Sequence, residues 1–343
     1  MIAIHHVKNS FSEEWINYCK KNKIDYTLID LFDNNILSNL REKKVKYLLF
    51  HISVGDYKTD LILKTICLIL EKEGIRVFPS YNEYWHYDDK LKQKYLFEHT
   101  NIPHASMTVF YNKKDAINWA EWEARYPFVF KLRGGAGSQN VKLVENKNQA
   151  FNLIKIMFGK GFNQAPNILQ DFGTKIRKHN KQNDWARALL RLPMTFSKRL
   201  KARKELSPEK GYFLTQEFYP DNDYDTRIAI IGDKAMGFVR KTRSNDFRAS
   251  GSGLIDYDRT KIDISMIKMA FDAAEKIGGH SLAFDFIYDR EKSPKIIEVS
   301  YCYVASFLFH SGGYWDRSLN FNSEPQKPEH LIIESLLNTN SLR

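Results

Sequence analysis

The chain has 343 residues, of which 43% are hydrophobic and 27% charged, and its formal net charge is +11. These values are typical of a soluble globular protein with a sizeable core and two or three compact parts. The sequence has no apolar run near the ~20 residues that a membrane span needs. Residues 1–8 lack a basic stretch followed by an apolar one, so we expect no signal peptide.

Most of the net positive charge lies in one segment. Residues 175–204 contain eleven lysines and arginines against a single acid, Asp184, which accounts for nearly the whole net charge. Because the rest of the chain is close to neutral, a protein that coats nucleic acid is not expected. The three cysteines have no metal or redox spacing, so we expect buried free thiols in a reducing cytosol.

Short apolar strands alternate with helices in the first part of the chain. Strands are expected at 2–6, 26–29, 46–52 and 75–78, and helices at 12–22 and 59–73. Gly74 supplies the stop for the second helix. This alternation predicts a small parallel α/β layer over about 1–80.

The pattern changes from residue 84 onward. Helices are expected at 89–98 and 264–277, and strands at 128–131, 141–144, 212–219, 226–231, 235–240, 282–288 and 295–299. A Gly232-Asp233 turn joins two of these strands. This part is therefore predicted to be α+β with a mostly antiparallel sheet.

A glycine-rich turn, residues 134–138, follows the strand that ends at Lys131. Its three glycines let the backbone approach an anion, so that successive N–H groups can surround phosphate oxygens beside the Lys131 charge. It is neither a P-loop nor a dinucleotide fingerprint, because a strand rather than a helix follows. A phosphate-binding loop is one interpretation, and a tight hairpin without function is the other.

Two acids, Asp285 and Glu298, lie inside apolar strands. A carboxylate among large apolar residues is costly unless it is paired or bound to a metal. On adjacent antiparallel strands the two could hold Mg²⁺ and thereby bind nucleotide phosphates. Two ordinary acids that face outward on alternating strands are the alternative.

Arginines form the third group of candidates. Arg227 and Arg240 lie on expected strands, and Arg248 lies in the small-residue segment 247–253. Such arginines suit an anionic substrate or a phosphoryl group in transfer. Surface salt bridges would explain each arginine singly.

Taken in this order, these clusters resemble the ATP-grasp superfamily, in particular the branch that contains ribosomal-protein glutamate ligases and glutathione synthetases. The resemblance covers about 84–155 and 211–302. It implies an α/β plus α+β fold with four parts: an N-terminal pre-ATP-grasp domain (1–83), a small lobe with the glycine loop (84–156), a basic insertion (157–210) and a large lobe with the metal site (211–343).

The resemblance also implies how Mg-ATP is bound between the lobes. Lys90 matches the lysine before the first small-lobe helix, Lys131 matches the lysine before the glycine loop, and Arg227 belongs to the "D-x-R" motif. Further matches are the loop over the phosphates (Gly134, Gly135, Gly137, Ser138), the adenine-binding segment (Gln216, Glu217, Tyr219) and the ribose-binding acid (Asp225).

Asp285 and Glu298 match the metal carboxylates of the family. The family usually has Glu-Val-Asn at the last metal strand, whereas this chain has Glu298-Val299-Ser300, and a serine hydroxyl is a weaker Mg²⁺ ligand than an amide oxygen. Ser300 therefore leaves open whether one or two ions bind. Arg240 and Arg248 match the positions expected to stabilise an acyl phosphate.

The resemblance implies an ATP-dependent ligase that joins a small-molecule or glycan carboxylate to an amine through an acyl phosphate. Further motifs look like an ATP-grasp group found with surface-polysaccharide biosynthesis genes; they are His5-His6, 85–90, 248–253 and Gly313-Tyr314-Trp315-Asp316. Kinase-type transfer to a sugar, or a non-catalytic nucleotide-binding regulatory protein, are the alternatives.

The basic segment 175–204 is not required by the family core. Apolar residues spaced three or four apart run through it: Trp185, Leu189, Leu192, Phe196 and Leu200. One hypothesis is that it binds an anionic partner, which would be a phosphorylated glycan carrier, a sugar nucleotide or the acidic inner face of the membrane, where this cytoplasmic protein would then lie at times. A solvated helical hairpin whose apolar stripe packs on the protein is the alternative.

Overall fold

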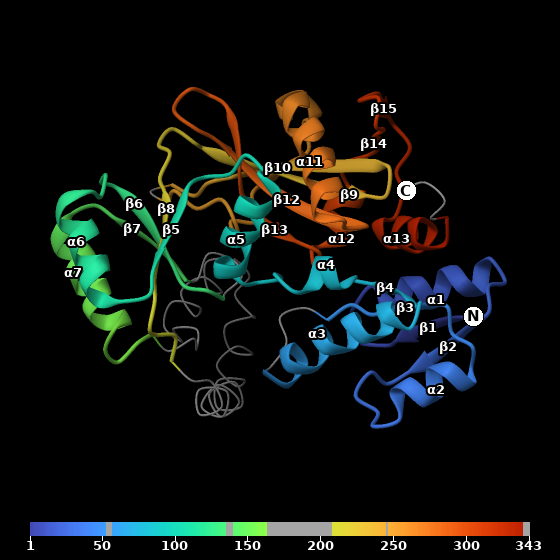
Figure 1. Ribbon diagram of the computed structural model, residues 1–343. Helices are drawn as coiled ribbons and strands as arrows, with labels where there is room; N and C mark the ends of the chain where they lie inside the picture. Colours follow the sequence, from blue (N-terminus) through green and yellow to red (C-terminus); the bar gives the residue numbers. More distant parts are fainter. Residues whose placement is uncertain (53–56, 135–139, 163–207, 245, 339–343) are drawn as a thin grey trace, which may run out of the picture. The chain divides into compact units, whose positions relative to one another are not determined.

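The computed structural model describes residues 1–52, 57–134, 140–162, 208–244 and 246–338 (Figure 1). The chain divides into two compact units. Unit 1 combines Met1–Ala105 with Tyr219–Arg343, and unit 2 is Ser106–Phe218. The helix expected at 89–98 spans Lys90–Thr100 and lies in unit 1.

Unit 1 begins with the predicted parallel layer, coloured blue in Figure 1. Its strands are β1 (Ile2–His5), β2 (Tyr26–Ile29), β3 (Tyr47–Leu49) and β4 (Arg76–Phe78), in the order β2-β1-β3-β4. All three pairings are parallel, as expected. The helices are α1 (Ser12–Lys21), α2 (Ile36–Glu42) and α3 (Tyr57–Lys72), of which α2 was not predicted.

The second sheet of unit 1 has seven strands and is antiparallel. Its order is β13-β12-β9-β10-β14-β15, and β11 pairs with β10. The bounds are β9 (Tyr224–Ile231), β10 (Lys234–Lys241), β11 (Ile255–Asp256), β12 (Ser281–Tyr288), β13 (Pro294–Ser300), β14 (Tyr314–Trp315) and β15 (Phe321–Asn322). Gly232, with φ +61°, makes the turn predicted between β9 and β10.

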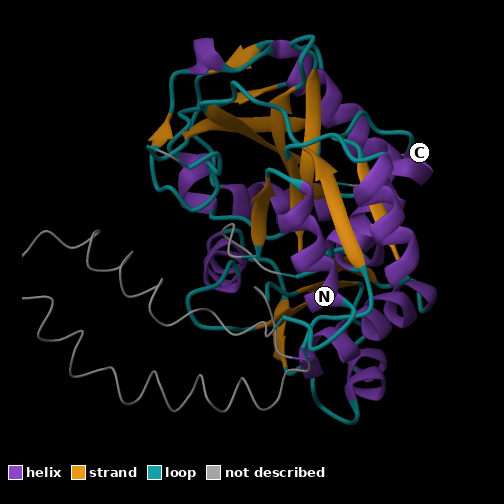
Figure 2. Cartoon of the chain, turned by 90° about the vertical axis from the view of Figure 1, so that its left-hand side faces the viewer, coloured by secondary structure: helices purple, strands orange, loops and turns teal. Residues whose placement is uncertain are grey.

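One face of this sheet is covered by α11 (Ile264–Ile277), which contacts β9, β10 and β12. The helix begins at Asp263, whose carboxylate accepts from the Ser265 N–H, and ends at Gly278 with φ +73°. Seven of its residues are buried, so its apolar stripe forms one layer of the core. Figure 2 shows the long strands in orange and the helices in purple. Because α11 covers one face of the second sheet, polar side chains of these strands can gather on the opposite face.

The described part of unit 1 also contains four shorter helices. They are α4 (Tyr81–Tyr84), α5 (Lys90–Thr100), α12 (Ala305–Phe309) and α13 (Pro328–Leu337), with a 3₁₀ turn at Arg259–Lys261. Helix α13 contacts α1, and Trp15 Nε1 donates to the Glu329 carbonyl at 2.9 Å.

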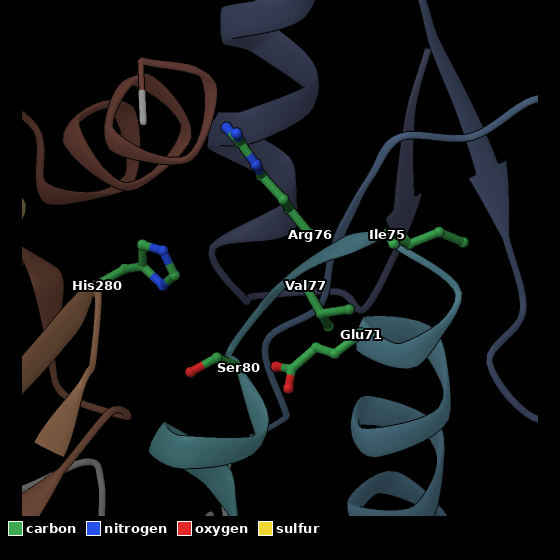
Figure 3. Close-up of a pocket in the computed structure, with 7 residues that line it drawn as sticks. Glu71, Ile75, Arg76, Val77, Ser80 and His280 are labelled. Atoms are coloured by element: carbon green, nitrogen blue, oxygen red, sulfur yellow. The ribbon is translucent and has the colours of Figure 1, made fainter. Parts of the chain in front are cut away.

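Glu83 is a buried link between α4 and β12. Its carboxylate accepts from the N–H groups of Ser80 (2.7 Å) and Ser281 (2.6 Å), which completes a capping box on α4. A cavity of about 300 Å³ opens nearby, and Figure 3 shows Glu71, Arg76 and His280 around it. Glu83 thus fixes the start of the strand that carries Asp285.

Unit 2 is an antiparallel sheet with the order β5-β8-β6-β7. The strands are β5 (Met107–Phe110), β6 (Phe128–Lys131), β7 (Val141–Val144) and β8 (Phe213–Glu217), and the helices are α6 (Lys113–Trp122) and α7 (Lys147–Met157). Phe128, Phe130 and Phe213 are buried around neighbouring rings such as Trp119. The strand–turn–strand predicted around the glycine loop is β6 and β7.

Two expectations about the whole chain can be compared with the structure. Among the described residues, no helix is long and apolar enough to cross a membrane. The three cysteines are free, as predicted, but only Cys19 and Cys67 are buried, whereas Cys302 is half-buried.

Candidate active site

Strand register brings the charged residues of unit 1 onto one face of the second sheet. Arg227 on β9 lies opposite Asp285 on β12, and Asp285 in turn lies opposite Glu298 on β13. Asp225, two residues before Arg227, lies opposite Arg240 on β10. Residues opposite each other, or two apart on a strand, share a face. Because α11 packs on the other face, these five side chains form a separate layer.

Four of these residues form a compact ion network. Arg227 donates to both oxygens of Asp285, at 2.7 and 2.8 Å. Arg240 donates to both oxygens of Asp225, at 2.6 and 2.7 Å, and its Nη2 also lies 2.7 Å from Asp285 Oδ2. The Asp285 side chain is only 3% exposed. Asp285 is therefore not an outward-facing acid, and Arg227 and Arg240 are not in surface salt bridges, whereas Glu298 lies outside this network and its side chain is 30% exposed.

The Asp285 carboxylate remains charged in this network. Burial by itself raises the pKa of Asp285, but the charges of Arg227 and Arg240 outweigh it and hold that pKa below its usual range. For Arg240, burial opposes the charged form, and the charges of Asp285 and Asp225 outweigh this and raise its pKa. Burial raises the pKa of Asp225, and the charge of Arg240 offsets this only in part, so Asp225 ionises less readily than Asp285.

Lys90 supplies a further cation at Glu298. Its Nζ lies 3.4 Å from Glu298 Oε1 and 3.5 Å from Asp88 Oδ1, and its side chain is 3% exposed. Burial lowers the pKa of Lys90, but the charges of Glu298 and Asp88 outweigh this and raise it overall. Asp88 was not singled out from the sequence.

Helix α5 is fixed in place by a contact that the sequence does not reveal. Gln93 Nε2 donates to the Val299 carbonyl (2.9 Å), and the Val299 N–H donates back to Gln93 Oε1 (3.4 Å). This side chain pairs with the edge of β13 as a neighbouring strand would. Lys90 lies three residues before Gln93 on the same face of α5, so the contact of Gln93 with Val299 places Lys90 next to Glu298.

An irregularity in β13 orients Glu298. The register shifts after Asp285, so that Ile297 has no partner residue on β12. Ile296 and Val299 are buried, while Glu298 and Ser300 lie toward the charged face. The Ser300 hydroxyl donates to the Cys302 carbonyl (2.8 Å) and accepts from the Cys302 N–H (3.1 Å).

Asp285 and Glu298 fit a divalent cation. Both supply carboxylate oxygens, which can act as metal ligands. Each carboxylate is already neutralised by a protein cation, Asp285 by Arg227 and Glu298 by Lys90. Among the described residues, no group of three or more His, Cys, Asp or Glu side chains comes together. Mg²⁺ is commonly held by one or two carboxylates with substrate phosphates and water, so two carboxylates suffice.

Arg248 lies apart from this network. Its backbone N–H and its guanidinium donate to the Asp246 carboxylate, at 2.8–3.0 Å for the Oδ1 contacts, and its side chain is 28% exposed. Arg243 binds the same carboxylate at 3.4 Å and also the Gly251 carbonyl. Asp246 thus folds the segment after β10 into a compact arginine-bearing loop.

In unit 2, Lys131 is a buried residue at the end of β6. The glycine loop follows it. Asn140 closes the base of the loop, because its Nδ2 donates to the Gly134 carbonyl (2.7 Å) and its carbonyl accepts from the Leu132 N–H (3.0 Å). The predicted residues Gly135, Gly137 and Ser138 lie outside the described residues, as does the basic segment 175–204.

A second set of contacts fixes the chain at the start of the glycine loop, and the sequence analysis did not predict it. The Arg133 N–H donates to the Tyr212 hydroxyl (2.7 Å), which donates to Glu209 (2.8 Å). The Arg133 guanidinium also binds Glu209, at 3.1 Å. Glu209 lies within the predicted insertion, so the end of that segment belongs to the structure around β6 and β8.

The residues predicted for adenine and ribose have separate positions. Gln216 and Glu217 end β8, and the Glu217 N–H donates to the Ser106 carbonyl (2.8 Å). Tyr219 is a buried residue that starts the second segment of unit 1. Asp225 is engaged with Arg240 by both oxygens, so the structure gives it an anchoring contact, and ribose binding by Asp225 stays a prediction.

Comparison with solved structures identifies the fold. A RimK domain ATP-grasp protein from Sphaerobacter thermophilus matches with a TM-score of 0.53 at 13% identity, covering 98% of this chain and 99% of that one. D-alanine–D-alanine ligase from Bacillus anthracis matches with 0.52 at 14% identity, over 98% and 96%. The chain has the ATP-grasp fold.

Sequence comparison is weaker but agrees with the ATP-grasp fold. The alpha-aminoadipate–LysW ligase LysX of Saccharolobus solfataricus is 19% identical over 232 residues, which is 68% of each chain. No protein-family model matches the sequence. A further solved structure, N5-carboxyaminoimidazole synthase from Aspergillus clavatus in complex with ADP and 5-aminoimidazole ribonucleotide, matches with a TM-score of 0.56 at 9% identity, covering 98% of this chain and 76% of that one.

Proposed function

We propose that this protein is an ATP-dependent ligase that joins a carboxylate to an amine through an acyl phosphate, with release of ADP. The observation that carries the proposal is the charged face of the second sheet, where Arg227, Arg240 and Lys90 surround Asp285 and Glu298 on an ATP-grasp fold. The similarity to LysX, whose name describes ligation of an amino acid, supports the same class of reaction.

The residues of the charged face have distinct roles in this proposal. Asp285 and Glu298 would hold Mg²⁺, which when bound neutralises nucleotide phosphate charge. Lys131 and the glycine loop would bind the phosphates, and Lys90 would keep Glu298 in position. Asp225 anchors Arg240, so that this guanidinium is fixed before the substrate arrives, which lowers the reorganisation needed during phosphoryl transfer.

The chemistry follows from charge placement. A substrate carboxylate attacks the γ-phosphorus, and the bond to ADP breaks. Arg240 and Arg248 stabilise the negative charge on the resulting acyl phosphate. An amine then attacks the acyl carbon and releases phosphate. Exclusion of water by the glycine loop protects the acyl phosphate from hydrolysis.

We further propose that the acceptor belongs to surface-polysaccharide biosynthesis and that residues 175–204 bind an anionic glycan carrier or membrane. The sequence motifs and the concentration of charge support these two points. They remain separate from the proposal of ligase activity.

The test is an ADP-release screen that pairs amino acids with uronic acids and amino-sugar nucleotides, followed by mass spectrometry of the product. An amide product with equimolar ADP supports the proposal. A phosphorylated sugar would favour kinase-type transfer. Absence of ADP release with every acceptor would favour a non-catalytic nucleotide-binding protein.

A further inference from the structure

Arg227 and Arg240 bind the same carboxylate, but they are anchored differently. Arg240 has a carboxylate of its own, since its Nε and Nη2 both donate to Asp225. Within the described part of the chain, both hydrogen bonds of the Arg227 guanidinium end on Asp285. The Arg227 side chain is also more exposed, at 18% against 9% for Arg240.

The oxygens of Asp285 are largely occupied by these arginines. Oδ1 accepts from Arg227 Nε, while Oδ2 accepts from Arg227 Nη2 and lies 2.7 Å from Arg240 Nη2. A divalent cation on Asp285 would stand beside two guanidinium groups, and like charges at such distances repel strongly where water is scarce. A metal ion on Asp285 would therefore favour the departure of one guanidinium.

We propose that Arg227 is the group that leaves: it neutralises Asp285 in the nucleotide-free protein and gives up this carboxylate when Mg-ATP binds. The inference rests on the proposed function. Arg240 stays, because Asp225 holds it by both oxygens. Arg227 loses its carboxylate partner, and its planar set of N–H donors then becomes available for phosphate oxygens, which it fits by two-pronged contacts.

The exchange has a consequence for the order of binding. With both carboxylates ionised, Asp225, Asp285, Arg227 and Arg240 together carry no net charge, and Glu298 already faces Lys90 at 3.4 Å. Each proposed metal ligand is therefore next to a protein cation and attracts a free metal ion weakly. ATP brings negative charge with its metal ion, and this charge also gives the displaced Arg227 a new partner. Metal and nucleotide are therefore expected to bind together, and metal alone poorly.

The test compares metal binding and nucleotide binding in the same variants. Arg227→Gln removes the competing guanidinium and leaves an uncompensated carboxylate. The matched control is Arg41→Gln, since Arg41 also contacts a carboxylate by two hydrogen bonds, to Glu73 at 2.9 and 2.6 Å, but on the surface. Free Mn²⁺ is followed by electron paramagnetic resonance without nucleotide, and ATP binding by calorimetry with Mg²⁺.

We expect Arg227→Gln to bind Mn²⁺ at least about tenfold more tightly than the wild type and Mg-ATP at least about tenfold more weakly, since a charged hydrogen-bond pair contributes this much. Arg41→Gln should change neither affinity. Opposite changes in the two affinities are the signature of exchange, because a variant that merely unfolds weakens both. Unchanged or weaker Mn²⁺ binding in a folded Arg227→Gln protein would overturn the inference. Failure of the wild type to bind Mg-ATP would instead overturn the proposed function.

Discussion

The buried ion network predicts a large loss of stability when Arg240 is replaced. Arg240→Met keeps much of the side-chain volume but leaves Asp225, whose side chain is 5% exposed, without the guanidinium that binds both its oxygens. Removing one partner of a buried ion pair typically costs about 3–5 kcal/mol. For a domain of 150–250 residues, each kcal/mol lowers Tm by about 2–4 °C. We therefore expect a decrease of roughly 6–20 °C.

The assay is thermal unfolding followed by circular dichroism near pH 7, with Arg41→Met as the control. Arg41 and Glu73 form an equally short two-pronged pair, but their side chains are 60% and 34% exposed, so the control should unfold close to the wild type. The pKa of Asp285 is held below its ordinary value. The part of the stabilisation that comes from the contact of Arg240 with Asp285 is therefore present above the unfolded pKa of about 4 and lost as pH falls from there through the lowered pKa of the folded protein. The pKa of Asp225 is raised by burial, so its contact with Arg240 does not share this dependence. Equal Tm values for both variants would refute the reasoning.

The remaining predictions concern the candidate active site, the buried link at Glu83 between α4 and β12, and the basic segment 175–204. Lys131→Ala and Glu298→Gln should each slow ATP-dependent turnover by about 10²–10³ in a steady-state ADP assay while leaving the circular dichroism spectrum unchanged, and a wild-type rate would contradict the assigned role. Burial lowers the pKa of His280, but the Glu83 carboxylate, whose Oε2 lies 3.9 Å from His280 Nδ1, outweighs this and raises the pKa overall. The Tm advantage of the wild type over His280→Gln should be full below pH 6.5 and shrink as pH rises above it, whereas a pH-independent difference would exclude this pairing. Changing Lys198, Arg199, Lys201, Arg203 and Lys204 to Gln should reduce co-sedimentation with anionic liposomes at low salt, and equal sedimentation of both proteins would remove the membrane hypothesis.

Much of the fold could be predicted because local signals and packing agree. Helix α11 coincides with the expected 264–277, since an apolar stripe, an aspartate cap and Gly278 all specify the same bounds. Strands β6 and β7 were predicted with the same bounds. Helix α2 was missed because its seven residues give too short an apolar pattern, with only Ile36 and Leu40 buried.

The site could be predicted only in part. Isolated acids in apolar strands indicate that Asp285 and Glu298 need partners, but not which partners they find. The contact of Arg227 with Asp285 joins residues 58 positions apart, and it depends on register. The shift that leaves Ile297 unpaired gives no alternation signal, so the orientation of Glu298 could not be derived from the sequence.

The central claim is that this chain makes an acyl phosphate from ATP and a carboxylate. The most direct measurement uses hydroxylamine in place of the amine, together with candidate carboxylates labelled with ¹⁸O. The account predicts a hydroxamate, ADP in equal amount, and one ¹⁸O atom transferred to inorganic phosphate. AMP release, or a phosphorylated product with no hydroxamate and no ¹⁸O in phosphate, would contradict it.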